Sequence, residues 1–384
     1  MTRKIAVVVT ARPSYARIKS ALRAIVEHPD LELQLIVAAS ALLDKYGSIV
    51  KYVEADGFEI TAKVYIVLEG ETLLTSAKST GLGIMELATI FDNLRPDVVV
   101  TVADRYETLA TAVAASYMNI PVAHVQGGEV TGSIDEKVRH AVTKLSNLHF
   151  ASTERAAERI IKMGEDPSSV YVTGCPSVDL AAEVLKKHAL DFDPFERYGG
   201  VGAEFDYKDG YLVVMQHPVT TEMGDGLEQI QETLHAVEAV EVPTFWFWPN
   251  VDAGSDGISR GLRIFREQGR DKNIHFFKNM VPEDFLRLIY NSRGIVGNSS
   301  VAIRESSFMG IPAVNIGNRQ AGRERGKNVT DVPYEKQAIQ DAILCILDNG
   351  HYEPDHIYGG GAAGTQIAEL LATAKLGIRK QLSY

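Results

Sequence analysis

Short apolar runs alternate with segments of helical spacing along most of the chain. The first run, Ile5–Thr10, carries no charge, which is typical of a strand buried on both faces of a parallel sheet. Residues 14–26 follow with apolar side chains at helical spacing, and residues 33–38 form the next strand-like run. This alternation continues to residue 173. The pattern therefore predicts an α/β fold with a doubly wound parallel sheet.

The alternation stops between residues 190 and 209, where Asp-Phe-Asp-Pro and several glycines replace it, and it resumes at residue 211. We interpret residues 190–209 as a linker. Residues 1–189 are then one Rossmann-like domain, residues 210–365 a second, nucleotide-binding one, and residues 366–384 a helix that packs back on the first. Two such domains are expected to place a ligand cleft at the C-terminal ends of their strands.

Charge and composition narrow the classes of partner and the compartment. The formal net charge of −11 argues against a general binder of nucleic acid or of anionic membranes, because such proteins are usually basic. The N-terminal apolar run is too short for a signal peptide, and no run approaches the roughly 20 apolar residues of a membrane span. Cys175 and Cys345 fit no zinc spacing and are expected to be buried, reduced thiols. We therefore expect a cytoplasmic protein that binds neither nucleic acid nor membrane.

Charged residues follow the predicted strands of the first half. Arg12 stands where the first strand gives way to a helix, so its guanidinium and the free N–H groups of the helix can bind a phosphate. The motif Gly-x-Gly-x-x-Gly is missing there, so no dinucleotide site is expected. Asp104 and Arg105 follow another apolar run; helix capping by Asp104 is the alternative to a role in a site.

The segment His124–His140 is the densest polar stretch beside predicted core elements. Ser133 and Glu136 fit a capping box, which leaves Asp135, in the first helical turn, to face the cleft. Arg139 lies four residues further along the same helix face and is expected to pair with Asp135. A well-capped helix with surface ion pairs is the alternative.

The second half shows the same arrangement of polar residues after strands. His217 follows a predicted strand, where it can donate to a phosphate or act as an acid, a buried core histidine being the alternative. Ser299 and Ser300 end another strand, and their hydroxyls suit a phosphate. Glu305 can accept from a ribose diol, and Arg323 adds a guanidinium after the next strand. Anion-binding signals in both halves indicate a diphosphate bound between the two domains.

Longer ordered motifs accompany these residues. They are Arg12-Pro-Ser, Asp104-Arg-Tyr, Gly127-Gly-Glu-Val-Thr-Gly-Ser-Ile-Asp135, Arg139-His-Ala-Val-Thr-Lys144, Gln216-His-Pro-Val-Thr-Thr221, Asn250-Val-Asp-Ala-Gly254, Gly297-Asn-Ser-Ser300 and Arg319-Gln-Ala-Gly-Arg323. From about residue 4 to residue 370 the chain resembles the hydrolysing UDP-N-acetylglucosamine 2-epimerases.

The resemblance implies two Rossmann-like domains arranged as in GT-B glycosyltransferases. It implies conversion of UDP-N-acetylglucosamine and water to N-acetylmannosamine and UDP, by anti elimination of UDP to a 2-acetamidoglucal and then hydration. The partners it implies are the UDP-sugar substrate and the UDP product, with a homodimer or homotetramer as the assembly. No metal and no redox cofactor are implied.

The family's functional residues carry over by position. Asp104 and Asp135 become the carboxylates that handle the C2 proton and the hydration step. The elimination needs a base at C2 and donors for the departing UDP. The implied substrate-binding residues are Arg12, Arg105, Arg139, His217, Asn250, Ser299, Ser300, Glu305 and Arg323.

One position departs from the family. Many members carry a glutamate two residues after His124, where this chain has Gln126, and an amide cannot exchange a proton as a carboxyl can. Either Glu129 takes the role, or the substrate differs. UDP-2,4-diacetamido-2,4,6-trideoxyglucose and GDP-N-acetylglucosamine are the alternative substrates. A non-hydrolysing epimerase, a GT-B glycosyltransferase and a non-catalytic nucleotide-sugar sensor are the alternative functions.

Overall fold

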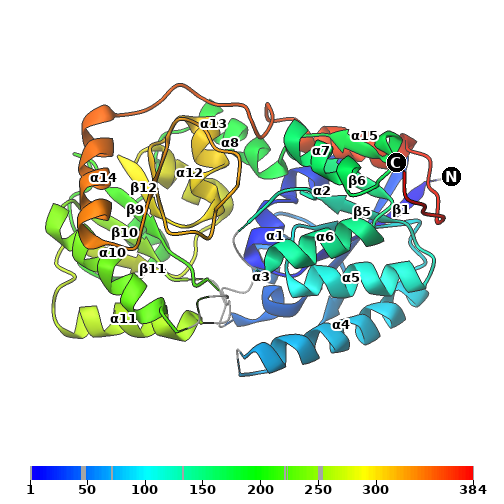
Figure 1. Cartoon of the computed structure of the whole chain (residues 1–384), viewed down its shortest axis with the longest axis horizontal. Coiled ribbons are helices and arrows are strands. Elements are labelled where there is room, and N and C mark those ends of the chain that lie inside the picture. Colours follow the sequence, from blue (N-terminus) through cyan, green and yellow to red (C-terminus); the bar gives the residue numbers. More distant parts are fainter. Residues whose placement is uncertain are drawn as a thin grey trace. The chain divides into compact units, whose positions relative to one another are not determined.

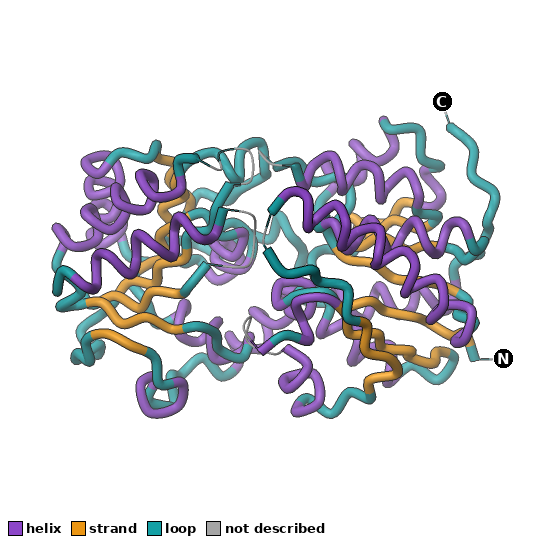
Figure 2. The backbone as a smooth tube through the Cα atoms, turned by 90° about the horizontal axis from the view of Figure 1, so that it is seen from below, coloured by secondary structure: helices purple, strands orange, loops and turns teal. Residues whose placement is uncertain are grey.

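The chain folds into two compact α/β units. In a computed structural model, residues 2–44, 49–70, 72–131, 134–219, 222, 224–249 and 254–383 are described. Unit 1 comprises residues 1–129, 134–179 and 358–384, and unit 2 comprises residues 130–133 and 180–357. Each unit contains one seven-stranded sheet with helices packed on both faces (Figures 1 and 2). The predicted fold class, two doubly wound α/β domains, is confirmed.

Unit 1 is built on a parallel sheet with the strand order β3-β2-β1-β4-β5-β6-β7. Its strands are β1 (Arg3–Val9), β2 (Leu31–Ala38), β3 (Ile60–Val64), β4 (Val98–Val102), β5 (Val122–Val125), β6 (Leu148–Ala151) and β7 (Val170–Val172). Its helices are α1 (Arg12–Ala16), α2 (Lys19–Glu27), α3 (Ile49–Ala55), α4 (Leu73–Leu94), α5 (Tyr106–Tyr117), α6 (Asp135–Leu145), α7 (Glu154–Lys162) and α15 (Ala363–Thr373), with the short turns η1 (Ala39–Leu42) and η3 (Pro167–Ser169). Helix α8 (Pro176–Lys186) passes from unit 1 into unit 2.

Unit 2 has the strand order β14-β13-β12-β9-β10-β11-β8. Its strands are β8 (Val201–Gly202), β9 (Leu212–Met215), β10 (Thr244–Phe247), β11 (Ile274–Phe277), β12 (Gly294–Gly297), β13 (Ala313–Ile316) and β14 (Val329–Val332). Its helices are α9 (Pro194–Tyr198), α10 (Gly226–Val240), α11 (Ser255–Glu267), α12 (Pro282–Tyr290), α13 (Glu305–Met309) and α14 (Lys336–Asn349), with the turn η4 (Ser300–Ala302). Only β8 runs antiparallel among the described strands of this sheet.

Strand β1 shows why the apolar runs form central strands. Ile5, Val7 and Val9 enter the core on one face of the sheet, whereas Ala6 and Val8 enter the core on the other. A strand buried on both faces cannot alternate apolar and polar residues, and so it reads as one continuous apolar run.

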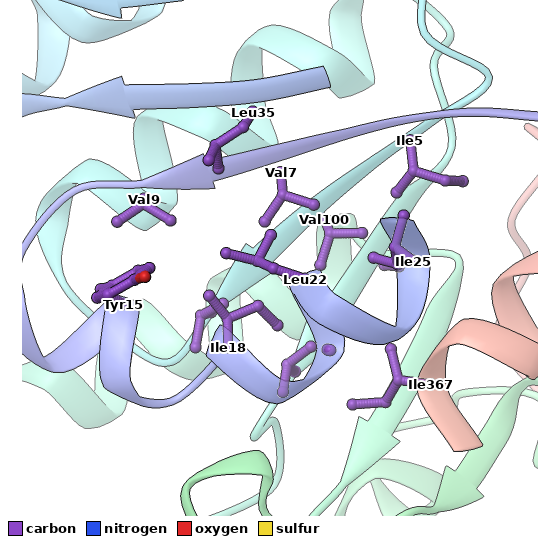
Figure 3. Packing of buried hydrophobic residues seen from close by; sticks show 14 of the residues in the cluster. Ile5, Val7, Val9, Tyr15, Ile18, Leu22, Ile25, Leu35, Val100 and Ile367 are labelled. Atoms are coloured by element: carbon purple, nitrogen blue, oxygen red, sulfur yellow. The ribbon is translucent and has the colours of Figure 1, made fainter. Parts of the chain in front are cut away.

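The C-terminal helix completes the core of unit 1. Ile367 of α15 packs beside Ile25 of α2, below the strand residues Ile5 and Val7 (Figure 3). Arg3 donates to the carbonyl of Ala374 at 3.1 Å just beyond that helix. Residues 358–384 therefore belong to unit 1 although they follow unit 2 in the chain.

The segment 190–209 lies inside unit 2, not between the units as the sequence suggested. It contains α9, and its strand β8 pairs with β11 through Gly202 and His275. Phe195 packs against Phe245 of the central sheet with 5.6 Å between ring centroids. The glycines thus allow a close edge pairing, and the aromatic residues bury the segment on the sheet.

The structure also bears on the two cysteines and on the possibility of a membrane-spanning helix. Cys175 is a buried free thiol as predicted, but Cys345 is exposed on α14, so that part of the prediction is wrong. Within the described ranges, no helix combines the length and apolarity that a bilayer crossing demands.

Candidate active site

In unit 1, the predicted residues gather at the C-terminal edge of the sheet. Arg12 begins α1 shortly after β1, Asp104 follows β4, and Gln126 follows β5. Because β1, β4 and β5 are neighbours in the sheet, their carboxyl ends lie side by side, which is where ligands bind in open α/β sheets.

Arg139 organises the acidic part of this edge. Its guanidinium is almost fully buried, forms an ion pair with Asp104, and donates to the backbone carbonyl of Glu129 at 2.8 Å. The side chains of Asp104 and Glu129 are themselves buried. A buried carboxylate requires a charged or hydrogen-bonding partner, so Arg139 fixes both the position of Asp104 and the path of the backbone at Glu129.

The predicted pair between Arg139 and Asp135 is wrong. Asp135 is the first residue of α6, as expected, and it is half-buried. Arg139 lies one turn later but points to Asp104, because that carboxylate is buried beside it and gains more from a guanidinium than a half-exposed one does. Ser133 of the predicted capping box lies outside the described residues, and Ile134 occupies the N-cap position of α6.

Arg105 is held by a second buried carboxylate. It is the N-cap residue of α5, and its guanidinium contacts Glu107 at 3.2 Å. Glu107 is fully buried, so this ion pair anchors Arg105 next to Asp104. The sequence placed Arg105 near the site but assigned no role to Glu107.

Gln126 is locked in place by its backbone and by its side chain. Its φ is +68°, a left-handed conformation that is uncommon for a residue with a side chain. Its Nε2 donates to Sγ of Cys175 at 3.0 Å, and that sulfur also contacts the hydroxyl of Ser177 at 3.0 Å. Among the described atoms, Oε1 of Gln126 has no hydrogen-bond partner. The amide is therefore fixed with one acceptor left for another group.

His124 has a structural role beside the acidic residues. Its Nε2 lies 2.7 Å from the carbonyl of Ala103, and its Nδ1 lies 3.2 Å from the hydroxyl of Thr143. Burial lowers the pKa of His124 to about 3, although the hydrogen bond to Ala103 acts in the opposite direction. The neutral ring donates to Ala103 and accepts from Thr143, and so joins the end of β4 to α6.

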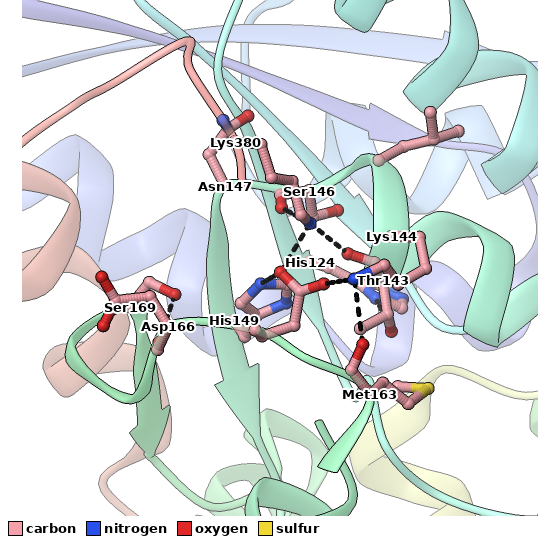
Figure 4. A network of polar contacts seen from close by, with 12 residues as sticks. His124, Thr143, Lys144, Ser146, Asn147, His149, Met163, Asp166, Ser169 and Lys380 are labelled. Carbon is pink, nitrogen blue, oxygen red and sulfur yellow. Dashed lines mark hydrogen bonds and ion pairs between the residues drawn. The ribbon is translucent and has the colours of Figure 1, made fainter. Parts of the chain in front are cut away.

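The end of α6 is tied down by the C-terminal tail (Figure 4). Lys380 donates to the carbonyl of Thr143 at 2.9 Å and forms an ion pair with the buried Glu165 at 2.6 Å. Burial alone would raise the pKa of Glu165, but hydrogen bonds from His149, Lys144 and Lys380 lower it to about 2. This network holds the helix that carries Asp135 and Arg139.

Arg12 stands on a helix of one turn. The hydroxyl of Ser14 accepts from the backbone N–H groups of Thr10 at 3.1 Å and Ala11 at 2.9 Å. Those two N–H groups are therefore already satisfied within the protein.

In unit 2, His217 and the serines follow neighbouring strands. His217 comes after β9 and is buried, and Ser299 and Ser300 come after β12. Asn298 joins these two loops, because its side chain bonds both the N–H and the carbonyl of His217. Asn298 belongs to the Gly297-Asn-Ser-Ser300 motif, which by itself indicated no role for its side chain.

The serines and Glu305 begin short helical turns. Ser299 caps η4 by accepting from the N–H of Val301 at 3.4 Å. Glu305 is the first residue of α13 and is buried. Within the described part of the chain, its Oε2 has no hydrogen-bond partner, as befits an acceptor that a ligand hydroxyl would satisfy.

Arg323 lies in the loop after β13 and is buried. Arg325 shapes this loop, because it donates to the carbonyls of Gln320 at 2.6 Å and Arg323 at 3.2 Å and pairs with Asp331 of β14. The sequence alone did not indicate the pair between Arg325 and Asp331, because it forms only when Asp331 is part of strand β14. Asn250, the remaining predicted binding residue, lies outside the described residues.

Known proteins of one family resemble this chain over most of its length. A family described as UDP-N-acetylglucosamine 2-epimerase matches residues 23–372. The chain is 32% identical over 377 residues to UDP-N,N'-diacetylbacillosamine 2-epimerase (hydrolyzing) of Legionella pneumophila, covering 98% of this chain and 97% of that protein. It is 31% identical over 371 residues to UDP-N-acetylglucosamine 2-epimerase of Neisseria meningitidis, covering 94% and 92%.

A solved structure supports the fold. The UDP-GlcNAc 2-epimerase of Methanocaldococcus jannaschii, in complex with UDP-GlcNAc and UDP, superposes with a TM-score of 0.78 at 19% identity and covers 96% of this chain and 99% of that chain. The family match spans most of the chain, and two relatives exceed 30% identity over nearly their whole length. The chain belongs to the UDP-N-acetylglucosamine 2-epimerase family.

Proposed function

We propose that the protein is a hydrolysing 2-epimerase that converts UDP-N-acetylglucosamine and water to N-acetylmannosamine and UDP. The observation that carries the proposal is the buried cluster at the edge of the unit 1 sheet, where Arg139 holds the Asp104 carboxylate and the Glu129 carbonyl. Glu129 adds a buried carboxylate, and Asp135 adds another at the start of α6, the helix that carries Arg139. Elimination and rehydration both demand positioned carboxylates.

The proposed reaction has two steps. In the first, a carboxylate takes the proton from C2, the C1–O bond breaks with its electron pair leaving on UDP, and a C1=C2 double bond forms. In the second, the hydroxyl of water adds to C1, and a proton returns to C2 from the opposite face. We assign the proton at C2 and the hydration to Asp104 and Asp135, with Glu129 in place of the acid that Gln126 cannot supply.

Unit 2 is proposed to bind UDP. The hydroxyls of Ser299 and Ser300, with His217 and Arg323, would stabilise the diphosphate as it departs. Glu305 would accept a hydrogen bond from the ribose, since one of its oxygens has no partner among the described residues.

A second substrate, the UDP-linked 2,4-diacetamido-2,4,6-trideoxy sugar, also has support. The relative from Legionella is named for that substrate class. The fixed Gln126 offers an amide oxygen that can accept a hydrogen bond from an additional N–H. Either sugar would undergo the same bond changes.

An NMR time course distinguishes these proposals. Purified protein is incubated separately with UDP-N-acetylglucosamine, its 2,4-diacetamido analogue and GDP-N-acetylglucosamine. Release of UDP together with a free manno-configured sugar supports a hydrolysing epimerase, and the fastest substrate identifies the sugar. A 2-epimerised sugar still linked to UDP would contradict the hydrolysing reaction, and binding of UDP without turnover would favour a sensor.

Substitution of the carboxylates tests their roles. Asp104→Asn and Asp135→Asn should each lower kcat by about a hundredfold or more, because an amide cannot transfer the proton, while the Kd for UDP changes little. Asp92→Asn, on the exposed face of α4, is the matched control and should keep normal turnover. Near-normal kcat in both active-site variants would refute the assignment.

A further inference from the structure

Asn298 links three loops of unit 2. It is fully buried at the end of β12. Its Oδ1 accepts from the N–H of His217 at 2.7 Å, and its Nδ2 donates to the carbonyl of the same residue at 2.8 Å. A side chain that satisfies both backbone groups of one residue fixes that residue as strand pairing would.

The backbone of Asn298 holds the third loop. Its carbonyl accepts from Nε2 of Gln320 at 2.8 Å and from Nη1 of Arg319 at 3.1 Å. Gln320 is buried, and its own carbonyl is bound by Arg325. The loop that carries Arg323 is thus fastened to the same residue as the loop that carries His217.

The residue before Asn298 leaves little freedom. Gly297 has φ of +131°, and a Cβ on it would lie 2.1 Å from the carbonyl oxygen of Met215. The N–H of Asn298 donates to that same oxygen at 3.1 Å. Strand β12 therefore stays paired with β9 up to Gly297, and the backbone of Asn298 is held against the end of β9.

We propose that Asn298 is a positioning residue that sets His217, Ser299 and the Arg323 loop in register for a diphosphate. It does so without contacting the ligand. The inference rests on the proposed function, because it assumes that these groups bind the diphosphate of UDP. Preorganised donors stabilise a developing anion without reorganising during the reaction. Asn298 holds the loops of His217 and Arg323, and the loop that contains Asn298 itself, in such a preorganised arrangement.

Asn298→Asp is the test, because it replaces one amide donor by an oxygen at nearly constant shape. The new oxygen faces the carbonyl of His217, so the loop must move. The Kd for UDP should rise about tenfold or more, corresponding to the loss of one hydrogen bond of a buried polar group. The Kd for uridine should change less than about threefold, because uridine has no diphosphate to be positioned.

Asn147→Asp is the matched control. Asn147 also bonds a backbone N–H, that of Val122 at 3.1 Å, and a carbonyl, that of Gly377 at 2.8 Å. It lies in unit 1 before β6, away from the C-terminal edge of that sheet. This variant should bind UDP and uridine as the wild type does.

The outcomes separate the two proposals. Unchanged UDP affinity in Asn298→Asp would overturn the positioning role, and so would an equal loss of UDP and uridine, which marks general damage to unit 2. If Asn298→Asp does not fold, Gln320→Met replaces it, since it frees only the Arg323 loop and should weaken UDP binding with uridine unaffected. Failure of the wild type to bind UDP would instead refute the proposed function.

Discussion

Replacing His124 with glutamine should remove one defined part of the acid sensitivity of unit 1. The imidazole is fully buried and uses both nitrogens, one toward the carbonyl of Ala103 and one toward the hydroxyl of Thr143. Only the neutral ring can donate to Ala103 while it accepts from Thr143, because both nitrogens of the protonated ring carry a hydrogen. Glutamine can donate to Ala103 but cannot titrate.

The magnitude follows from the pKa of His124. Burial lowers it from the ordinary value of 6.5 to about 3 in the folded chain. Between these two values the unfolded chain binds one proton that the folded chain does not. Stability is therefore unaffected by this group above pH 6.5, falls as the pH drops from 6.5 to 3, and levels off below that. At about 1.4 kcal/mol for each pKa unit, the full effect is about 5 kcal/mol, and about 2 to 3 kcal/mol of it lies between pH 6 and pH 4.

The assay must report unit 1 separately. Both tryptophans, Trp246 and Trp248, lie in or next to β10, so their fluorescence follows unit 2. Urea-dependent hydrogen exchange, read by mass spectrometry on peptides from residues 98–125, follows unit 1 at each pH. The tryptophan transition in the same samples is the internal control and should be the same in wild type and His124→Gln.

The stability of the variant relative to wild type is the decisive quantity. As the pH falls from 7 to 4, the stability of His124→Gln should rise relative to wild type, since only the wild type loses the contribution of the neutral ring. The pKa of His149 is also lowered, first by burial, but that group is present in both proteins and cancels in the difference. Stability curves that remain parallel from pH 7 to pH 4 would refute the reasoning.

Three further substitutions test the edge of the unit 1 sheet. Arg139→Met should destabilise unit 1 by about 3 to 5 kcal/mol, because it removes the guanidinium that pairs with the buried Asp104 carboxylate; wild-type stability in urea-dependent exchange would contradict this. Gln126→Glu should lose stability relative to wild type as the pH rises from 5 to 8, because ionisation then places a charge in a buried site; a difference constant with pH would count against it. Ala103→Gly should raise the melting temperature, since φ at Ala103 is +66° and a left-handed conformation costs a residue with a Cβ about 1 to 2 kcal/mol; a lower melting temperature would show that the strain is relieved by neighbouring contacts.

The sequence predicted the central strands, the residues that follow them and the edge strand β7, but not the edge strands β3, β8 and β14. Central strands such as β1 and β9 are buried on both faces and read as apolar runs. Strands β3 and β14 lie at the sheet edges, where half-exposed side chains give only a weak pattern. Their registers depend on neighbours far away in the chain, so the pattern of one segment could not reveal them.

Pairing within the site was the least predictable part. Arg139 was expected to bind Asp135 one turn away, but it binds Asp104, which is 35 residues distant. Helical spacing identifies which residues share a face, yet the partner of a buried guanidinium is decided by which carboxylate is also buried. The same limit hid Asn298, whose role depends on a loop 81 residues earlier.

Backbone strain at the strand ends is another feature that the sequence pattern does not reveal. In unit 1, Ala39, Ala103 and Gln126 each follow the last residue of a strand, and each has a left-handed φ. In unit 2, Gly297 and Gly317 hold comparable places.

The two units use different residue types at these left-handed positions, and the reason differs between them. A Cβ on Gly317 would come within 2.3 Å of the ring of Tyr334, so unit 2 must use glycine there. In unit 1, the side chain of Gln126 is accommodated and bonded to Cys175. A glycine after a strand can be recognised in a sequence, whereas an alanine or glutamine in the same conformation cannot. Strain of about 1 to 3 kcal/mol at each such residue persists only where surrounding contacts hold it. Ala103 bonds the ring of His124 through its carbonyl, and Gln126 comes two residues after His124 in the chain. Surrounding contacts hold both residues in the left-handed conformation, at the edge of the unit 1 sheet where the proposed chemistry takes place.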